Sequence, residues 1–231
     1  MLPDASIAGH KVSDRVLQAS TLIELLTLVN PRLMRGGSLQ HTFLMLLLSL
    51  VLQAPATAQE QLIDRPEWGA YFEKFDASGT IVILDQRATP TTLAAFSPER
   101  AATRLSPAST FKIPHTLFAL DSGAIADEFQ IFQWDGIERS YAPQNQDQNL
   151  RSAIRSSALW VFEIVAEEIG EARAREYLEL IGYGNEDPGT EAGAYWVEGK
   201  LAISALEQVE FLRRLFYNEL PFQKAHQLLL K

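Results

Sequence analysis

A serine and a lysine three residues apart are the first residues in this sequence that could do chemistry together. Ser109 and Lys112 lie in a segment where Ser106 and Pro107 predict the start of a helix, with Ser106 as its hydroxyl cap. Residues at i and i+3 share one helix face, so we expect the Lys112 amine to reach the Ser109 hydroxyl. Backbone N–H groups of a first helical turn are free to stabilise an oxyanion. The pattern predicts a serine nucleophile beside its base.

A Ser-x-x-Lys match alone has little specificity. Average composition makes about one chance match expected in a chain of this size, and the alternative is a capped core helix with a lysine that reaches the surface. The expected helix, from Pro107 to about Leu120, is apolar on nearly all sides, and Gly123 follows as its stop. Lys112 would therefore be desolvated, which lowers the pKa of an amine below its ordinary value of about 10.4.

Composition restricts the class of protein. The chain has 231 residues, 47% of them hydrophobic, which is enough for a sizeable core. A net charge of −9 with no basic run does not favour nucleic acid as a partner. The absence of cysteine excludes disulfides and thiolate catalysis. No two of the four histidines have a ligand-pair spacing, so we predict no metal site.

The expected elements form a strand pair followed by a long helical block. The strands are expected at 79–84 and 91–96. Helices are expected at 68–75, 150–155, 158–169 and 170–181, after a capping box at 204–207, and from about 221 onward. One strand pair cannot cover the apolar surface of that block, so we expect that the C-terminal strands of the sheet are missing from this sequence.

The first part of the chain reads as an export signal. From Met34 onward, Arg35 gives a positive start, residues 43–52 an apolar run, and Ala56-Thr57-Ala58 a small-residue cleavage site. This predicts a secretory signal peptide at 34–58, preceded by an upstream extension at 1–33 whose role is unclear. The mature chain would be periplasmic and would keep no stable membrane anchor, because ten apolar residues are too few to span a bilayer.

Four motifs in order carry a family resemblance. The segment P-A-S-T-F-K-I-P around Ser109 resembles the class D (oxacillinase-type) serine β-lactamases. Ser157-Ala158-Leu159 resembles the S-x-V element of that family, Tyr183-Gly184-Asn185 matches its Y-G-N, and Trp196-Val197-Glu198-Gly199 resembles its W-x-E-G. The similarity runs from about residue 59 to residue 231, so this range is expected to be a partial serine β-lactamase domain. The implied fold is α/β (α+β), the β-lactamase and penicillin-binding transpeptidase fold, in which an antiparallel sheet is flanked by a helical subdomain.

The resemblance also implies an activity. It is hydrolysis of β-lactam antibiotics of the penicillin type, a small-molecule substrate, through an acyl-enzyme at Ser109. Lys112, carbamylated to N-carboxylysine, would be the general base, and carbon dioxide bound as this carbamate is the only added group that the resemblance implies. Ser157 would relay the proton to the leaving nitrogen, and the Trp196 indole would hold the carbamate. The expected site-lining residues are Leu159, Tyr183 and Asn185.

The sequence departs from the family pattern at two places. Leu159 replaces the valine of S-x-V, which would reshape the pocket around Lys112. No K-T-G follows Tyr183, so the chain reads as C-terminally truncated before that motif and its activity is in question. Three alternatives therefore stay open: a penicillin-sensing receptor domain that is acylated without hydrolysis, a penicillin-binding transpeptidase, and a non-catalytic fragment.

Several residues also have purely structural interpretations. Ser156 competes with Ser157 for the relay position, and either could cap a helix. The Tyr183-Gly184-Asn185 segment could be only the turn that closes the preceding helix. Trp196 could be an ordinary core residue, and we expect His115 to be a hydrogen-bonded core residue.

Overall fold

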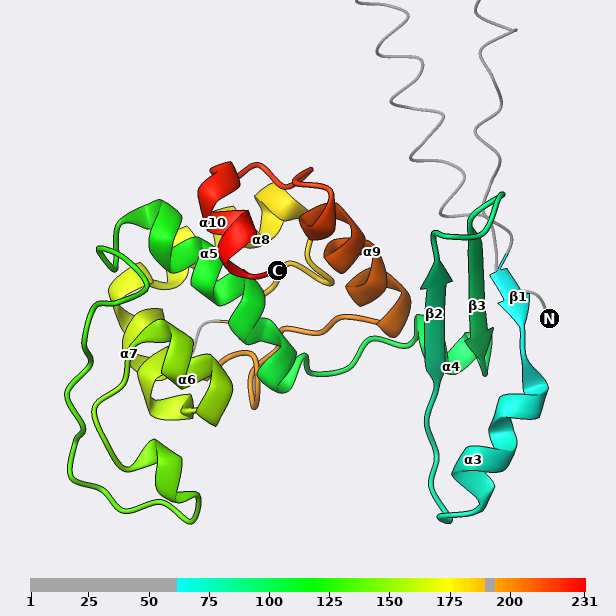
Figure 1. Cartoon of the computed structure of the whole chain (residues 1–231), viewed down its shortest axis with the longest axis horizontal. Coiled ribbons are helices and arrows are strands. Elements are labelled where there is room, and N and C mark those ends of the chain that lie inside the picture. The colour runs from blue at the N-terminus through cyan, green and yellow to red at the C-terminus, as the bar shows by residue number, and fades with distance from the viewer. Residues whose placement is uncertain (1–61, 190–193) are drawn as a thin grey trace, which may run out of the picture. The chain divides into compact units, whose positions relative to one another are not determined.

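The computed structural model describes residues 62–189 and 194–231, and Figure 1 shows their arrangement. The expected extension at 1–33 and signal peptide at 34–58 lie outside the described residues. The strands are β1 (Leu62–Asp64), β2 (Ile81–Asp85) and β3 (Thr92–Phe96). The helices are η1 (Pro66–Trp68), α3 (Gly69–Glu73), α4 (Pro98–Ala102), η2 (Ala108–Phe111), α5 (Lys112–Ser122), η3 (Ala142–Gln144), α6 (Leu150–Ser156), α7 (Leu159–Ile169), α8 (Glu171–Ile181), α9 (Ala205–Phe216) and α10 (Lys224–Leu229).

The sheet has the strand order β1-β3-β2. Strands β2 and β3 pair antiparallel, with Ile83 opposite Ala94, which confirms the expected hairpin. Strand β1 was not predicted, and it pairs parallel to β3. Its three residues are too few for a period-two pattern, so it forms because β3 offers a partner.

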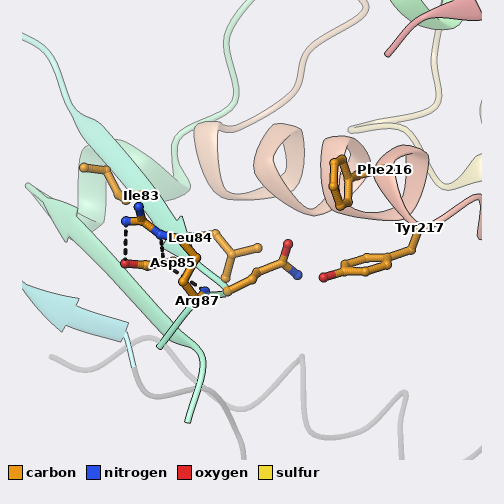
Figure 2. Close-up of a pocket in the computed structure, with 7 residues that line it drawn as sticks. Ile83, Leu84, Asp85, Arg87, Phe216 and Tyr217 are labelled. Atoms are coloured by element: carbon orange, nitrogen blue, oxygen red, sulfur yellow. Dashed lines mark hydrogen bonds and ion pairs between the residues drawn. The ribbon is translucent and has the colours of Figure 1, made fainter. Parts of the chain in front are cut away.

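Strand β2 lies at one end of the strand order, and helix α9 contacts it. Helix α4 contacts both α9 and β3. Beside β2 and the end of α9 the surface is hollowed, as Figure 2 shows. The residues that line this hollow are Ile83, Leu84, Asp85, Gln86, Arg87, Phe216 and Tyr217. Ile83 and Tyr217 are each 47% exposed, so this part of the surface is notably apolar.

Helix α5 carries the central packing of the helical part. It packs against α7 and α10, and its residues from Pro114 to Ala119 are buried. This confirms that a helix apolar on nearly all sides is a core helix. The structure divides the expected helix into the 3-10 turn η2 and the α-helix α5, which ends at a left-handed Gly123 as predicted.

Capping boxes define where helices α6 and α9 begin. Ser204 and Glu207 form the predicted capping box of α9, and Asn149 forms a second one with Ser152 at the start of α6. The expected break between 150–155 and 158–169 is present, with Ser157 in the left-handed conformation between α6 and α7. The break fixes the direction in which the Ser157 side chain leaves the backbone.

The described residues contain neither a membrane-spanning helix nor a cluster of metal ligands. Across residues 62–189 and 194–231, no helix has both the length and the apolar character needed to cross a bilayer. Within the same residues, no group of three or more histidine, aspartate or glutamate side chains is arranged to hold a metal ion.

Candidate active site

The turn η2 and the start of α5 place Ser109 beside Lys112. The distance from Lys112 Nζ to Ser109 Oγ is 3.1 Å, so the amine can exchange a proton with the hydroxyl. The continuous helical path through η2 and α5 puts both side chains on one face, as the three-residue spacing predicts. Ser109 is exposed and Lys112 is only 4% exposed, so the hydroxyl meets solvent while the amine is buried beneath it.

Ser157 joins this pair from the break between α6 and α7. Lys112 Nζ donates to Ser157 Oγ at 2.6 Å, and the oxygens of Ser157 and Ser109 are 3.3 Å apart. The two hydroxyls and the amine therefore form a closed triangle of hydrogen-bond distances. Ser157 adopts φ +55°, the left-handed region that non-glycine residues rarely occupy. An unfavourable backbone conformation next to a group of potentially catalytic side chains is typical of functional sites.

Ser156 has a different place from Ser157. Its hydroxyl donates to the Ser152 carbonyl at 2.8 Å, and its side chain is buried. The alternative relay serine is thereby held inside the α6 turn, and the geometry favours Ser157.

Burial lowers the pKa of the Lys112 amine below its ordinary range. The hydrogen-bond partners of Nζ are hydroxyls rather than carboxylates, so no opposite charge compensates the lost hydration. The centroid of the Phe162 ring lies 5.6 Å from Lys112 Nζ, so this ring forms part of the apolar surroundings of the amine. Phe162 was not singled out from the sequence, although it lies one helical turn after Leu159 and on the same face of α7.

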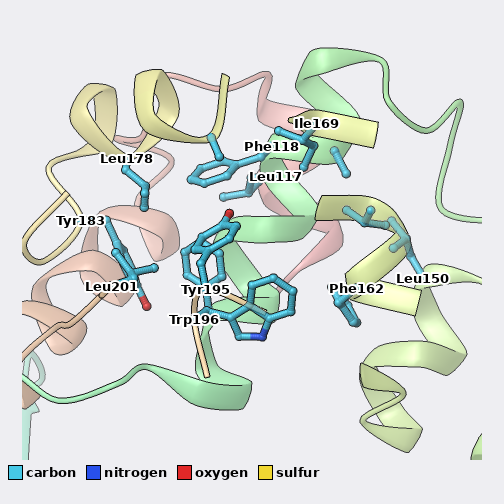
Figure 3. Close-up of a cluster of buried hydrophobic side chains, with 14 of the residues drawn as sticks. Leu117, Phe118, Leu150, Phe162, Ile169, Leu178, Tyr183, Tyr195, Trp196 and Leu201 are labelled. Carbon is cyan, nitrogen blue, oxygen red and sulfur yellow. The ribbon is translucent and has the colours of Figure 1, made fainter. Parts of the chain in front are cut away.

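Trp196 packs against aromatic side chains of η2 and α5. Its indole is fully buried within the hydrophobic cluster that Figure 3 shows. The ring centroid lies 4.6 Å from that of His115, which it meets edge-on, and 6.0 Å from that of Phe111, on which it stacks. The indole Nε1 is buried and has no hydrogen-bond partner within the described residues. Buried donors are almost always paired. We therefore expect this N–H to have an acceptor other than the groups of residues 62–189 and 194–231.

Ser106 does not cap the helix, so that expectation is wrong. Pro107 occupies the cap position, and the Ser106 hydroxyl lies 2.8 Å from the Trp196 carbonyl oxygen. The tertiary contact wins because the chain folds the 196–199 turn against the start of η2. Local sequence could not show a partner 90 residues away.

His115 is a core residue, as expected, but the expected hydrogen bonds are not found. Both ring nitrogens are buried and have no partner among the described residues. Burial among aromatic rings lowers the pKa of His115 to about 3, so the imidazole is neutral.

The remaining predicted site residues have structural contacts. The Tyr183 hydroxyl donates to Gln208 Oε1 at 2.8 Å, and its buried ring packs edge-on to Phe111 at 5.4 Å. Asn185 donates from Nδ2 to the Lys200 carbonyl at 2.7 Å. These contacts favour the turn interpretation of the Y-G-N segment. Leu159 is the first residue of α7 and is 37% exposed.

The Tyr183-Gly184-Asn185 turn requires a glycine at position 184. It adopts φ +60°, and a side-chain Cβ at this position would lie 2.1 Å from the Ala202 carbonyl oxygen. The turn therefore passes against the segment that leads from Trp196 into α9.

Comparisons with known proteins agree with these motifs. The family described as the penicillin binding protein transpeptidase domain matches residues 78–224. β-Lactamase OXA-20 of Pseudomonas aeruginosa is 55% identical over 190 residues, which cover 82% of this chain and 71% of that protein. β-Lactamase OXA-2 of Salmonella typhimurium is 57% identical over 176 residues, 76% of this chain. The chain belongs to the class D β-lactamase family.

Solved class D β-lactamases show the same fold. BAT-2 has a TM-score of 0.65 at 36% identity, over 71% of this chain and 67% of its own. The class D β-lactamase YbXI from Nostoc has a TM-score of 0.66 at 36% identity, over 70% and 68% of the two chains. The expected β-lactamase and transpeptidase fold is thereby confirmed. This class D chain spans 64% of the length of OXA-2.

Proposed function

We propose that the protein hydrolyses β-lactams of the penicillin type through an acyl-enzyme at Ser109. The observation that supports this most directly is the triangle of Ser109 Oγ, Lys112 Nζ and Ser157 Oγ, with distances of 2.6 to 3.3 Å. An exposed hydroxyl next to a buried amine is the arrangement that an activated serine nucleophile requires. The family membership and the names of the β-lactamase relatives point to the same substrate class.

In the acylation step, the neutral Lys112 amine takes the proton of the Ser109 hydroxyl. The Ser109 oxygen attacks the lactam carbonyl carbon, and the lactam C–N bond breaks. Ser157, which contacts both groups, passes the proton from Lys112 to the leaving nitrogen. In the second step, a water molecule gives its proton to the same amine and attacks the ester carbon. The Ser109 oxygen leaves and recovers its proton.

The oxyanion needs a donor near Ser109. In the described part of the chain, the backbone N–H of Ser109 donates to no acceptor, whereas those of Ala108 and Thr110 are bonded to the carbonyls of Trp196 and Pro107. A free N–H at the nucleophile itself is well placed for the developing negative charge.

The residues around Lys112 fit a carbamate on its amine. The buried Trp196 Nε1, which has no hydrogen-bond partner among the residues that the structure describes, would hold it. Such a carbamate would replace the free amine as the base in both steps, with a carboxylate oxygen taking each proton. Incorporation of ¹³C-labelled bicarbonate, followed by NMR, tests this: a carbamate signal is expected in the parent and in Lys224→Ala, and is absent in Lys112→Ala. A signal that survives Lys112→Ala contradicts the assignment.

We also propose export through a signal peptide cleaved after Ala58. The pattern at 34–58 in the sequence supports it. The remaining chain would be periplasmic and would bind a small-molecule β-lactam, with no nucleic-acid partner. Peptide mapping of the exported protein should find Gln59 at the N-terminus. A mature protein that keeps residues 1–33 contradicts this proposal.

Covalent labelling and turnover test the proposed function. Ser109→Ala should abolish labelling by a fluorescent penicillin, and labelling that persists in this variant removes Ser109 from the role. A chromogenic cephalosporin separates the alternatives, because hydrolysis gives steady turnover, a penicillin-sensing domain gives a single burst, and a non-catalytic fragment gives no signal.

A further inference from the structure

The segment before the nucleophile is tied to the turn that contains Trp196. The Ser106 hydroxyl lies 2.8 Å from the Trp196 carbonyl oxygen and 3.0 Å from that of Val197. The backbone N–H of Ala108 donates to the same Trp196 carbonyl at 2.9 Å. A hydroxyl carries one proton, so it donates to one carbonyl at a time, and the shorter distance favours Trp196. Two donors on either side of Pro107 thus converge on one acceptor.

These bonds hold a backbone conformation that is unfavourable by itself. Ala108 adopts φ +45°, where the Cβ of an L-residue crowds the backbone. Such a conformation persists only when the surrounding structure over-determines it. Ala108 directly precedes Ser109, so its torsions set the direction from which the Ser109 side chain approaches Lys112.

The Trp196 turn is a rigid anchor for this purpose. The indole is fully buried against Phe111 and His115. The N–H groups of Val197 and Glu198 both donate to the Ala194 carbonyl, at 2.8 and 3.1 Å. An anchor with these contacts gives the Ser106 and Ala108 donors a fixed target.

We infer that Ser106 is a positioning residue for the Ser109 nucleophile. Its hydroxyl bond to the Trp196 backbone keeps Ala108 in the left-handed conformation, and this conformation keeps Ser109 Oγ within reach of Lys112 and Ser157. The inference rests on the proposed function. It gives the Trp196 turn a second task, because its backbone aims the nucleophile while its ring packs on the helix that carries Lys112.

Three variants test this inference. Ser106→Ala removes the hydroxyl at an exposed position and leaves no cavity. Ser106→Thr keeps a hydroxyl. Ser122→Ala is the matched control, because it removes a hydroxyl that donates to a carbonyl, that of Ala119 at 3.2 Å, at the C-terminal end of α5. The measurement is the rate of covalent labelling by a fluorescent penicillin over a range of concentrations.

We expect Ser106→Ala to lower the maximal labelling rate about 10-fold, because a small misplacement of a reacting group has a large effect on rate. The half-saturating concentration should change by less than about 2-fold, since Ser106 aims the nucleophile rather than binding substrate. Ser106→Thr should restore the rate to within about 2-fold of the parent, and Ser122→Ala should match the parent. A parental maximal rate in Ser106→Ala overturns the inference.

A second measurement separates this inference from the proposed function. Amide hydrogen exchange at Ala108 reports its bond to the Trp196 carbonyl without any chemistry at Ser109. Faster exchange is expected in Ser106→Ala but not in Ser106→Thr. If the parent chain is not labelled at all, the proposed function fails, and unchanged exchange in Ser106→Ala then overturns the positioning role as well.

Discussion

Lys112 is 4% exposed, and its amine contacts two hydroxyls. A buried amine without an opposite charge is a local source of instability, because desolvation disfavours its charged form. Active sites commonly keep such groups at the cost of stability. The same burial that makes Lys112 a base should therefore make its removal stabilising.

Replacing Lys112 by methionine tests this at the residue scale. Methionine has a similar length and no charge, so Lys112→Met should raise the melting temperature at pH 7 by about 2–4 °C, which corresponds to about 1 kcal/mol for a chain of this size. It should also abolish labelling by penicillin. Thermal unfolding followed by circular dichroism measures the first effect, with Lys224→Met at an exposed position as the control. A lower melting temperature in Lys112→Met contradicts the prediction.

The pH dependence has a definite sign for Lys112. Its pKa is lowered in the folded state, so between that pKa and about 10.4 the unfolded chain binds more protons. The contribution of Lys112 to the free energy of unfolding therefore rises with pH across this window. The rate of Ser109 labelling by penicillin should also increase with pH, because the neutral form of the Lys112 amine is the base.

His115 gives a second pH prediction. Its pKa is lowered to about 3, so from pH 6.5 downward the unfolded state binds a proton that the folded state does not. The free energy of unfolding should fall by up to about 1.4 kcal/mol per pH unit between pH 6.5 and 4.5, and His115→Phe should flatten this slope. Urea unfolding at several pH values measures it. Hydrogen bonds from Arg87 and Arg139 lower the pKa values of Asp85 and Asp135 to about 2, so these two carboxylates affect the free energy of unfolding only below this pH range. A slope that persists in His115→Phe would show that another group causes it.

At the scale of elements, the break between α6 and α7 sets the place of Ser157. The α6 helix is fixed at its start by the Asn149 capping box and ends at a residue with φ +55°. The fold thus holds a non-glycine residue in a glycine-like conformation so that a hydroxyl can reach Lys112.

Two variants of Ser157 separate its backbone role from its chemical role. Ser157→Gly should have a free energy of unfolding about 1 kcal/mol higher than that of Ser157→Ala, because both lose the hydroxyl and only glycine has no Cβ to crowd in the left-handed region. Both variants should lose most of the acylation rate, since neither has the hydroxyl. Denaturant unfolding and penicillin labelling measure the two effects, and a glycine variant less stable than the alanine variant would contradict the strain.

Much of this element pattern follows from sequence, for physical reasons that differ between elements. A β-branched run predicted β2, and a hairpin across the polar loop that follows it predicted β3. The capping box predicted the start of α9. Strand β1 was missed because its pairing with β3, not its own residues, defines it. Ser106 was misassigned because a serine before proline is a cap by local rules, whereas its partner is distant in the chain. Ser109 and Lys112 lie together as expected, because their three-residue spacing depends on helix geometry alone. Ser157 was expected beside them only from the family resemblance, because tertiary packing places a residue 45 positions away in the chain.

At the scale of the whole molecule, β2 lies at one end of the strand order, next to the apolar hollow formed with α9. No other strand in residues 62–189 or 194–231 pairs with its outer edge. An edge of this kind, with the uncharged run Ile81-Val82-Ile83-Leu84, is a template for pairing with another chain.

A charge on this strand should reduce self-association. Ile83→Lys places a lysine at a position that is 47% exposed, and charged side chains on an edge strand oppose pairing. Light scattering of the purified chain at rising concentration should show at least about 2-fold less association than in the parent. Ile137→Lys is the control, because Ile137 is 60% exposed and lies outside the strands. Equal scattering by Ile83→Lys and the parent would show that association uses another surface.

The bonds between Ser106 and Trp196 also have a consequence for the order of folding. Together with the paired backbone groups of Leu105 and Ile203, they close a loop of 90 residues. Closing a loop of this length has an entropic cost that is met before its contacts form, whereas Ser109 and Lys112 are neighbours as soon as η2 and α5 form. We therefore expect the nucleophile and its base to be paired early in folding, but to reach their final orientation only when the loop closes. The reactive geometry should be among the last features that a folding chain acquires.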